Sequence, residues 1–149
     1  MLREKDLSRE NYVALALRAA QVCGAHGIPL IPHTHAVPGI EALHVPFPLL
    51  SEALARQFRL SVSVHSAGEA RQAAAMGASF VIAGHIFKTA CKPGVTPRGL
   101  AFLKECSEAA LIPVYAIGGV TGENAPLCIE AGAAGVCRMS FWMEGDLGA

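Results

Sequence analysis

The chain of 149 residues has no net charge, few aromatic side chains and no paired-cysteine motif. Twelve Lys and Arg residues balance twelve Asp and Glu residues, so the whole molecule presents no field that would attract nucleic acid or an anionic membrane surface. Its apolar runs are interrupted well short of the roughly 20 residues that a membrane-spanning helix needs. We therefore expect no nucleic-acid partner, no membrane partner and, for any anion, a local binding site.

The cysteines also exclude two classes of small protein. The five are odd in number, widely spread and form no Cys-x-x-Cys pair, which argues against a disulfide frame and against a structural zinc site. The N-terminus opens on charged residues instead of a signal peptide, and we expect a cytoplasmic location. At 52% hydrophobic and 16% charged, residues 1–149 are expected to form a single domain.

The second half of the chain alternates short apolar runs with helical patterns, which is typical of βα units on a parallel sheet. We predict strands over residues 60–65, 79–87, 112–117 and 135–139. Ser66-Ala-Gly-Glu69 is a capping box that predicts a helix ending at Gly77. Thr96 with Pro97, and Thr121, are the expected starts of the two helices that follow.

The first half is broken by prolines. Ser8 is expected to cap a helix, and residues 2–4, 28–31 and 43–45 are expected to form three short strands. Seven parallel strands in order predict an α/β fold of the (β/α)₈ TIM-barrel type that lacks its first strand, its first helix and most of its last helix. An open doubly wound sheet is the alternative. Because an open sheet edge attracts another chain, we expect a homodimer.

The candidate site lies just beyond the predicted strand at 79–87. Groups past the carboxyl end of a parallel strand project into the crevice where ligands bind, and His85 stands at that point. An imidazole can take and return a proton near neutral pH, so His85 is the candidate base; a buried structural histidine is the alternative. The polar loop that follows contains Thr89, Cys91 and Lys92.

A phosphate site is expected at the ends of the last two strands. Gly118-Gly119 forms a turn with exposed amide groups at a helix start, and Met139-Ser140 supplies a further N–H and a hydroxyl. Ser63 is expected to point into the same interior by the period of two along its strand.

A metal is not expected, although two histidines sit at ligand spacing. His33 and His35 form a His-x-His pair, but no Asp or Glu lies between residues 28 and 40 to complete a site. His44 is interpreted as an interior group.

Four stretches of the chain together resemble the thiamine phosphate synthase superfamily. They are Ser61-Val-Ser-Val-His-Ser66, Gly84-His-Ile-Phe-Lys-Thr-Ala-Cys-Lys-Pro-Gly94, Ala116-Ile-Gly-Gly119 with Asn124, and Ala131-Gly-Ala-Ala-Gly-Val136 with Met139-Ser140. Arg3-Glu4-Lys5 resembles the end of that superfamily's second strand, so the resemblance covers nearly the whole chain.

The superfamily has two branches, and the resemblance favours one of them. Synthases carry an Asn-Asp pair and a further Asp that hold Mg²⁺ and a pyrophosphate, whereas this chain has His33-Thr34 at the first position and no acid over residues 42–50. The thiazole tautomerases use no such metal and carry a histidine in the motif that contains His85 and Cys91. By this resemblance the chain is expected to be an isomerase without a cofactor.

The reaction so implied is aromatisation of a thiazole phosphate carboxylate in thiamine biosynthesis by a proton shift through His85. The small-molecule partner would be this phosphorylated thiazole. The residues expected to contact it are Arg3, Lys5, Ser63, Thr89, Cys91, Lys92, Gly118, Gly119, Met139 and Ser140. Two alternatives stay open: a synthase that uses Mg²⁺ to join hydroxymethylpyrimidine diphosphate and thiazole phosphate, and a non-catalytic phosphate-binding or regulatory remnant.

Overall fold

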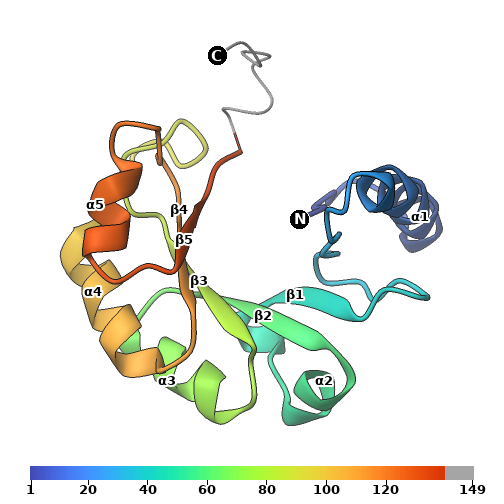
Figure 1. Ribbon diagram of the computed structural model, residues 1–149, viewed down its shortest axis with the longest axis horizontal. Coiled ribbons are helices and arrows are strands. Elements are labelled where there is room, and N and C mark those ends of the chain that lie inside the picture. Colours follow the sequence, from blue (N-terminus) through green and yellow to red (C-terminus); the bar gives the residue numbers. More distant parts are fainter. Residues whose placement is uncertain (140–149) are drawn as a thin grey trace.

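A computed structural model of the chain describes residues 1–139, and its centre is one parallel sheet (Figure 1). The five strands lie side by side in the order of the sequence. They are β1 (Ala42–Pro46), β2 (Arg59–Val64), β3 (Phe80–Gly84), β4 (Val114–Ile117) and β5 (Gly135–Cys137). Parallel strands in sequential order with helical crossovers are the arrangement of a (β/α)₈ barrel, so the predicted α/β fold is confirmed.

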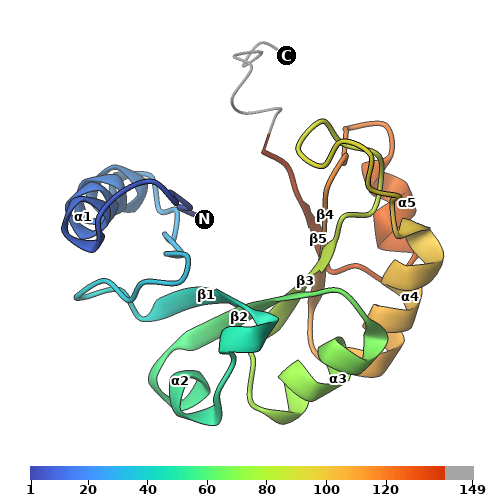
Figure 2. The same cartoon turned by 180° about the vertical axis from the view of Figure 1, so that it is seen from behind.

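One helix precedes the strands and the others connect them. The helices are α1 (Arg9–Ala25), η1 (Phe47–Leu49), α2 (Glu52–Gln57), α3 (Ala67–Ala75), α4 (Gly99–Ala110) and α5 (Ala125–Glu130). Figures 1 and 2 show α3, α4 and α5 together along one side of the sheet, whereas α1 lies on the other side of the molecule. No helix within residues 1–139 combines the length and apolar character needed to cross a membrane.

Small apolar side chains on the outer face of the sheet form the main core. Val62, Val64, Val81, Val114 and Ala116 are at most 1% exposed and belong to the cluster that packs against α3 and α4. Burying a valine side chain stabilises the fold by roughly 1.5–3 kcal/mol relative to leaving it in water. Because side chains alternate along a strand, the residues between these valines face the interior of the incomplete barrel.

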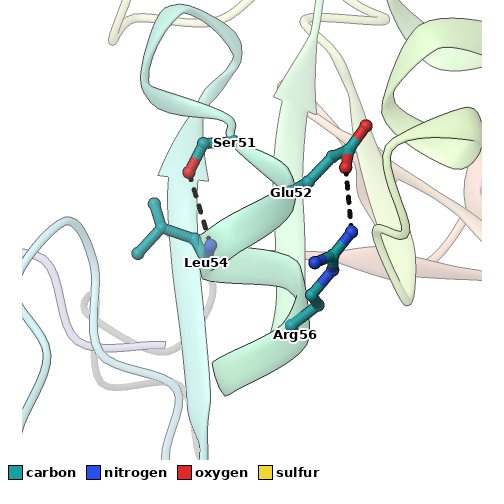
Figure 3. Close-up of polar contacts among 4 residues, drawn as sticks. All are labelled: Ser51, Glu52, Leu54 and Arg56. Carbon is teal, nitrogen blue, oxygen red and sulfur yellow. Dashed lines mark hydrogen bonds and ion pairs between the residues drawn. The ribbon is translucent and has the colours of Figure 1, made fainter.

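The helix starts follow the capping signals where the local sequence is unambiguous. The Ser66 hydroxyl accepts a hydrogen bond from the Glu69 N–H at 3.1 Å, and the Glu69 carboxylate accepts from the His65 N–H at 2.7 Å. Helix α2 begins in the same way, with Ser51 accepting from the Leu54 N–H and an exposed Glu52–Arg56 pair on the next turn (Figure 3).

One predicted helix cap is wrong, and one caps the turn just before its helix. Helix α4 begins at Gly99 after Arg98, with no side-chain cap, three residues beyond Thr96. Helix α5 begins at Ala125, and in the turn before it the Thr121 hydroxyl accepts a hydrogen bond from the Asn124 N–H while the Asn124 side chain accepts from the Thr121 N–H, as in a capping box. The short helices η1 and α2 were not predicted, because the prolines around them indicated a loop.

The first two predicted strands are reduced to isolated bridges. Leu2 pairs with Pro32, and His33 pairs with His44 of β1, both in parallel. The prediction of a strand over residues 28–31 is therefore wrong by position: the sheet contact lies one to two residues later. Pro29 and Pro32 have no N–H to donate, so the segment cannot form a continuous ladder. The bridges still continue the barrel order beyond β1.

Candidate active site

His44 anchors a polar cluster on the inner face of β1 and β2. Its Nδ1 lies 2.8 Å from the Ser61 hydroxyl and its Nε2 lies 2.8 Å from the Ser63 hydroxyl. The ring is 2% exposed, and burial, with the charges of His33, the amino terminus and Arg3, lowers its pKa from 6.5 to about 3. The imidazole is therefore neutral, with one ring nitrogen donating and the other accepting. The interpretation of His44 as an interior group is confirmed.

His33 extends this cluster sideways, because it pairs with His44 in a parallel bridge. Its ring centroid is 5.2 Å from that of His44, and its Nδ1 lies 2.7 Å from the Thr34 hydroxyl. Burial, then the positive charges of Arg3 and Lys5, lowers the pKa of His33 below its ordinary value. The two side chains predicted from the Arg3-Glu4-Lys5 motif are thus close enough to act electrostatically on this imidazole.

The donor set here does not suit the Mg²⁺ that a synthase-type site implies. Mg²⁺ requires oxygen ligands at about 2.0–2.1 Å, with carboxylates among them. The cluster offers imidazole nitrogens and hydroxyls that already bond to one another, beside two cationic side chains. Among residues 1–139 no three His, Cys, Asp or Glu side chains are grouped to hold a metal ion.

A second group forms in the segment that follows β3. This segment surrounds an open cavity of about 210 Å³. The cavity is lined by Lys88, Thr89, Lys92, Pro93, Gly94, Val95, Thr96 and Pro97. The lining residues include two lysines and two threonines, residue types that can bind a phosphate or diphosphate anion.

His85 joins this loop to the end of β3. Its ring is 5% exposed, and Nε2 lies 3.3 Å from the carbonyl oxygen of Val95. Its own carbonyl accepts a hydrogen bond from the Arg98 N–H at 3.0 Å. His85 lies directly after the end of β3, as predicted, and its ring contacts the loop at Val95.

The Gly118–Gly119 turn lies directly against the start of the same loop. Both residues have positive φ, +96° and +66°, and a Cβ on either would overlap with His85 or with the backbone of Phe87 and Lys88. The Phe87 N–H donates to the Gly118 carbonyl at 2.9 Å, and the Asn124 amide donates to the Gly119 carbonyl at 3.0 Å. Only glycine permits this approach, which brings the predicted phosphate turn beside the lysine loop.

The predicted site residues thus fall into two groups. Thr89 and Lys92 line the loop cavity and Gly118–Gly119 adjoins the loop, while Ser63, Arg3 and Lys5 belong to the cluster around His33 and His44. Cys91 is exposed and does not line the cavity, Met139 is 59% exposed beyond β5, and Ser140 lies outside the described residues.

Sequence reasoning missed two members of these groups. Lys88 lines the cavity together with Lys92, and its place in the same polar loop was the available signal. His33 was considered only as a metal ligand, whereas it packs against His44.

Comparison with known proteins identifies the family. The sequence matches the thiamine monophosphate synthase family over residues 1–141. It is 34% identical to the thiamine-phosphate synthase of Roseiflexus castenholzii over 93% of this chain and 65% of that protein. It is 30% identical to the thiamine-phosphate synthase of Caldanaerobacter subterraneus subsp. tengcongensis over 99% of this chain and 74% of that protein. The chain thus spans about two thirds to three quarters of the length of these relatives.

A solved structure supports the fold assignment. The thiamine phosphate pyrophosphorylase of Pyrococcus furiosus superposes with a TM-score of 0.83 at 22% identity, covering 97% of this chain and 73% of that one. At this identity the likeness establishes the fold alone.

These comparisons correct the predicted activity. Relatives at 30–34% identity are named as synthases, which contradicts the expected isomerase of the tautomerase branch and favours the transferase alternative. The His85 motif that suggested the branch covers a few residues, whereas these alignments cover almost the entire chain. The superfamily itself is confirmed: the chain belongs to the thiamine monophosphate synthase family.

Proposed function

We propose that the protein is a transferase of the thiamine-phosphate synthase type, joining hydroxymethylpyrimidine diphosphate to a thiazole phosphate. In this reaction the thiazole ring nitrogen supplies the electron pair for a new bond to the exocyclic carbon of the pyrimidine. The bond from that carbon to the diphosphate oxygen breaks, and diphosphate leaves with its electron pair. Because no proton is transferred, the step needs no general base, and binding and charge stabilisation of two anions are the main requirements.

The observation that carries this proposal is the proximity of two anion-suited elements at one edge of the sheet. The Gly118–Gly119 turn, which the sequence predicts as a phosphate turn, packs against the loop whose cavity is lined by Lys88 and Lys92 among other residues. We assign the monophosphate of the thiazole to the glycine turn and the diphosphate to the lysine side chains. This arrangement would place the ring nitrogen of one ligand beside the diphosphate-bearing carbon of the other.

The His44 cluster is assigned to the uncharged part of a ligand. Ser63 is half-buried and hydrogen-bonded to the neutral His44 ring, so its hydroxyl can hydrogen-bond to an uncharged ligand group. Since the donor set does not suit Mg²⁺, we assign compensation of the diphosphate charge to Lys88 and Lys92 of the loop. Arg3 and Lys5, whose charges act on His33, are assigned to ligand binding at the His44 cluster.

The test is formation of thiamine phosphate from the two substrates, measured by chromatography with fluorescence detection after oxidation. Parallel reactions contain MgCl₂ or EDTA. Replacing Lys92 with Ala should weaken substrate binding by on the order of tenfold, because a charge-assisted hydrogen bond contributes about 1.5–3 kcal/mol. Replacing Lys104, an exposed residue on α4 that pairs with Glu108, is the matched control and should have no effect. Absence of product in both reactions would refute the transferase.

One observation favours a second function, ligand binding without turnover. The cluster at the first strands has no carboxylate to hold a divalent cation. A non-catalytic member would bind thiazole phosphate and diphosphate, and replacing Lys92 would weaken that binding, but it would form no thiamine phosphate. Isothermal titration calorimetry beside the activity assay separates the two functions.

A further inference from the structure

The loop that carries the lysines is fastened to the sheet at few points. At its base, the Arg98 N–H donates to the His85 carbonyl and the Gly99 N–H to the Ile86 carbonyl. Farther along, the hydrogen bonds stay inside the loop: Lys92 N–H to the Thr89 carbonyl, and Val95 N–H to the Lys92 carbonyl. Such local turns shape the loop but do not fix its position over the sheet.

One side chain reaches across to the interior of the loop. Within residues 1–139, the contact of the His85 Nε2 with the Val95 carbonyl is the only hydrogen bond that ties residues 89–97 to the end of β3. Because a carbonyl oxygen only accepts, Nε2 carries the proton in this arrangement. The ring is buried, and Gly118 beside it has no side chain, which leaves the room that His85 needs.

We propose that His85 is a positioning residue, whose ring holds the loop of residues 88–97 in the conformation in which Lys88 and Lys92 line the same cavity. The proposal rests on the proposed function for the identity of the anion as the diphosphate of a substrate. Loss of the imidazole donor removes neither lysine from the sequence, but it lets the loop occupy positions in which the two lysines no longer lie around the same cavity. Binding then weakens because the loop must be ordered by the ligand.

The variants separate the donor from the ring. His85→Ala removes both, whereas His85→Phe keeps a ring and removes the donor. His65→Ala is the matched control: His65 stands at the same sheet edge and bonds the Gly84 carbonyl at 3.1 Å, but it makes no hydrogen bond to the loop. Urea unfolding of each variant establishes that the fold is retained.

The first measurement is limited trypsin digestion followed by mass spectrometry. Lys92 is followed by Pro93, which blocks cleavage there, so cleavage after Lys88 reports the loop. Both His85 variants should be cut after Lys88 on the order of fivefold faster than the wild type, as loss of one hydrogen bond implies, with other sites unchanged. The His65 variant should be cut at the wild-type rate. Cleavage after Lys88 at that rate in both His85 variants would overturn the proposal.

The second measurement is binding of inorganic diphosphate by calorimetry, with kinetics of the transferase reaction beside it. We expect a Kd and a KM for the diphosphate substrate about fivefold higher in both His85 variants, with kcat within twofold of the wild type. A kcat that falls by orders of magnitude with KM unchanged would assign the ring to chemistry and overturn positioning. If no turnover is found with any protein, the proposed function fails, while proteolysis and diphosphate binding still decide the role of His85.

Discussion

Acidification should destabilise this protein through one buried ring. His44 is 2% exposed, bonded to two serines and has a folded pKa of about 3 against 6.5 in water. The unfolded chain therefore binds a proton at this ring below pH 6.5, and the folded chain does not until about pH 3. The stability that neutral His44 confers is fully present above pH 6.5 and is lost as pH falls from 6.5 toward 3.

The size of the effect follows from the two pKa values. Between pH 7.5 and pH 5.0 the contribution is about 1.36 kcal/mol per pH unit below 6.5, or roughly 2 kcal/mol. The assay is urea denaturation at both pH values for the wild type and for His44→Gln. Since the pKa of His33 is also lowered, both proteins should lose some stability, and the wild type should lose about 2 kcal/mol more. An equal loss in the two proteins would refute the assignment of a neutral, serine-bonded His44.

Three further predictions concern the site and its scaffold. Calorimetric binding of inorganic diphosphate should give the same Kd within twofold in EDTA and in MgCl₂; a requirement for Mg²⁺ would contradict the reading of the donor set. Gly119→Ala should lower the free energy of unfolding by about 1–3 kcal/mol, because its Cβ meets the Lys88 backbone at φ +66°. Gly24→Ala in open helical space should instead stabilise by about 0.5–1 kcal/mol, and a similar loss in both variants would refute the steric argument. Exposed Cys91 should react with a thiol reagent at pH 8 while Cys106, whose pKa burial raises to about 11, stays unmodified by mass spectrometry; equal labelling would contradict its burial.

The βα half of the fold could be predicted because each unit contains its own local signals. Alternation in the segment that becomes β2 places Ser61 and Ser63 on one face and Val62 on the other, and Ser66 with Glu69 marks the helix start. The proline-rich first half offered no such signals. Ile28, taken as part of a strand, is 57% exposed, because the pairing that shapes this region is between distant residues, Leu2 with Pro32 and His33 with His44.

The candidate site was predictable in position but not in the direction of its side chains. The rule for strand ends located His85, the polar loop and the glycine turn, which the structure brings together. The hydrogen bond from the ring to Val95 depends on how the intervening residues 86–94 fold back, and no periodicity encodes that. The activity was inferred from the histidine motif. A histidine that positions a loop and one that transfers a proton cannot be distinguished by their place in the sequence.

The two hydrophobic clusters differ in size, so the two parts of the chain that they stabilise should differ in local stability. Tyr12, Ala16 and Val37 form a small cluster of buried residues that is separate from the main core of the sheet. Among the described residues, a single parallel bridge, His33 with His44, joins the first forty residues to β1, since the other bridge, Leu2 with Pro32, lies within those forty residues. Backbone amides of α1 should therefore exchange with deuterium through sub-global opening, well before those of β2 and β3, which are released only when the whole barrel unfolds.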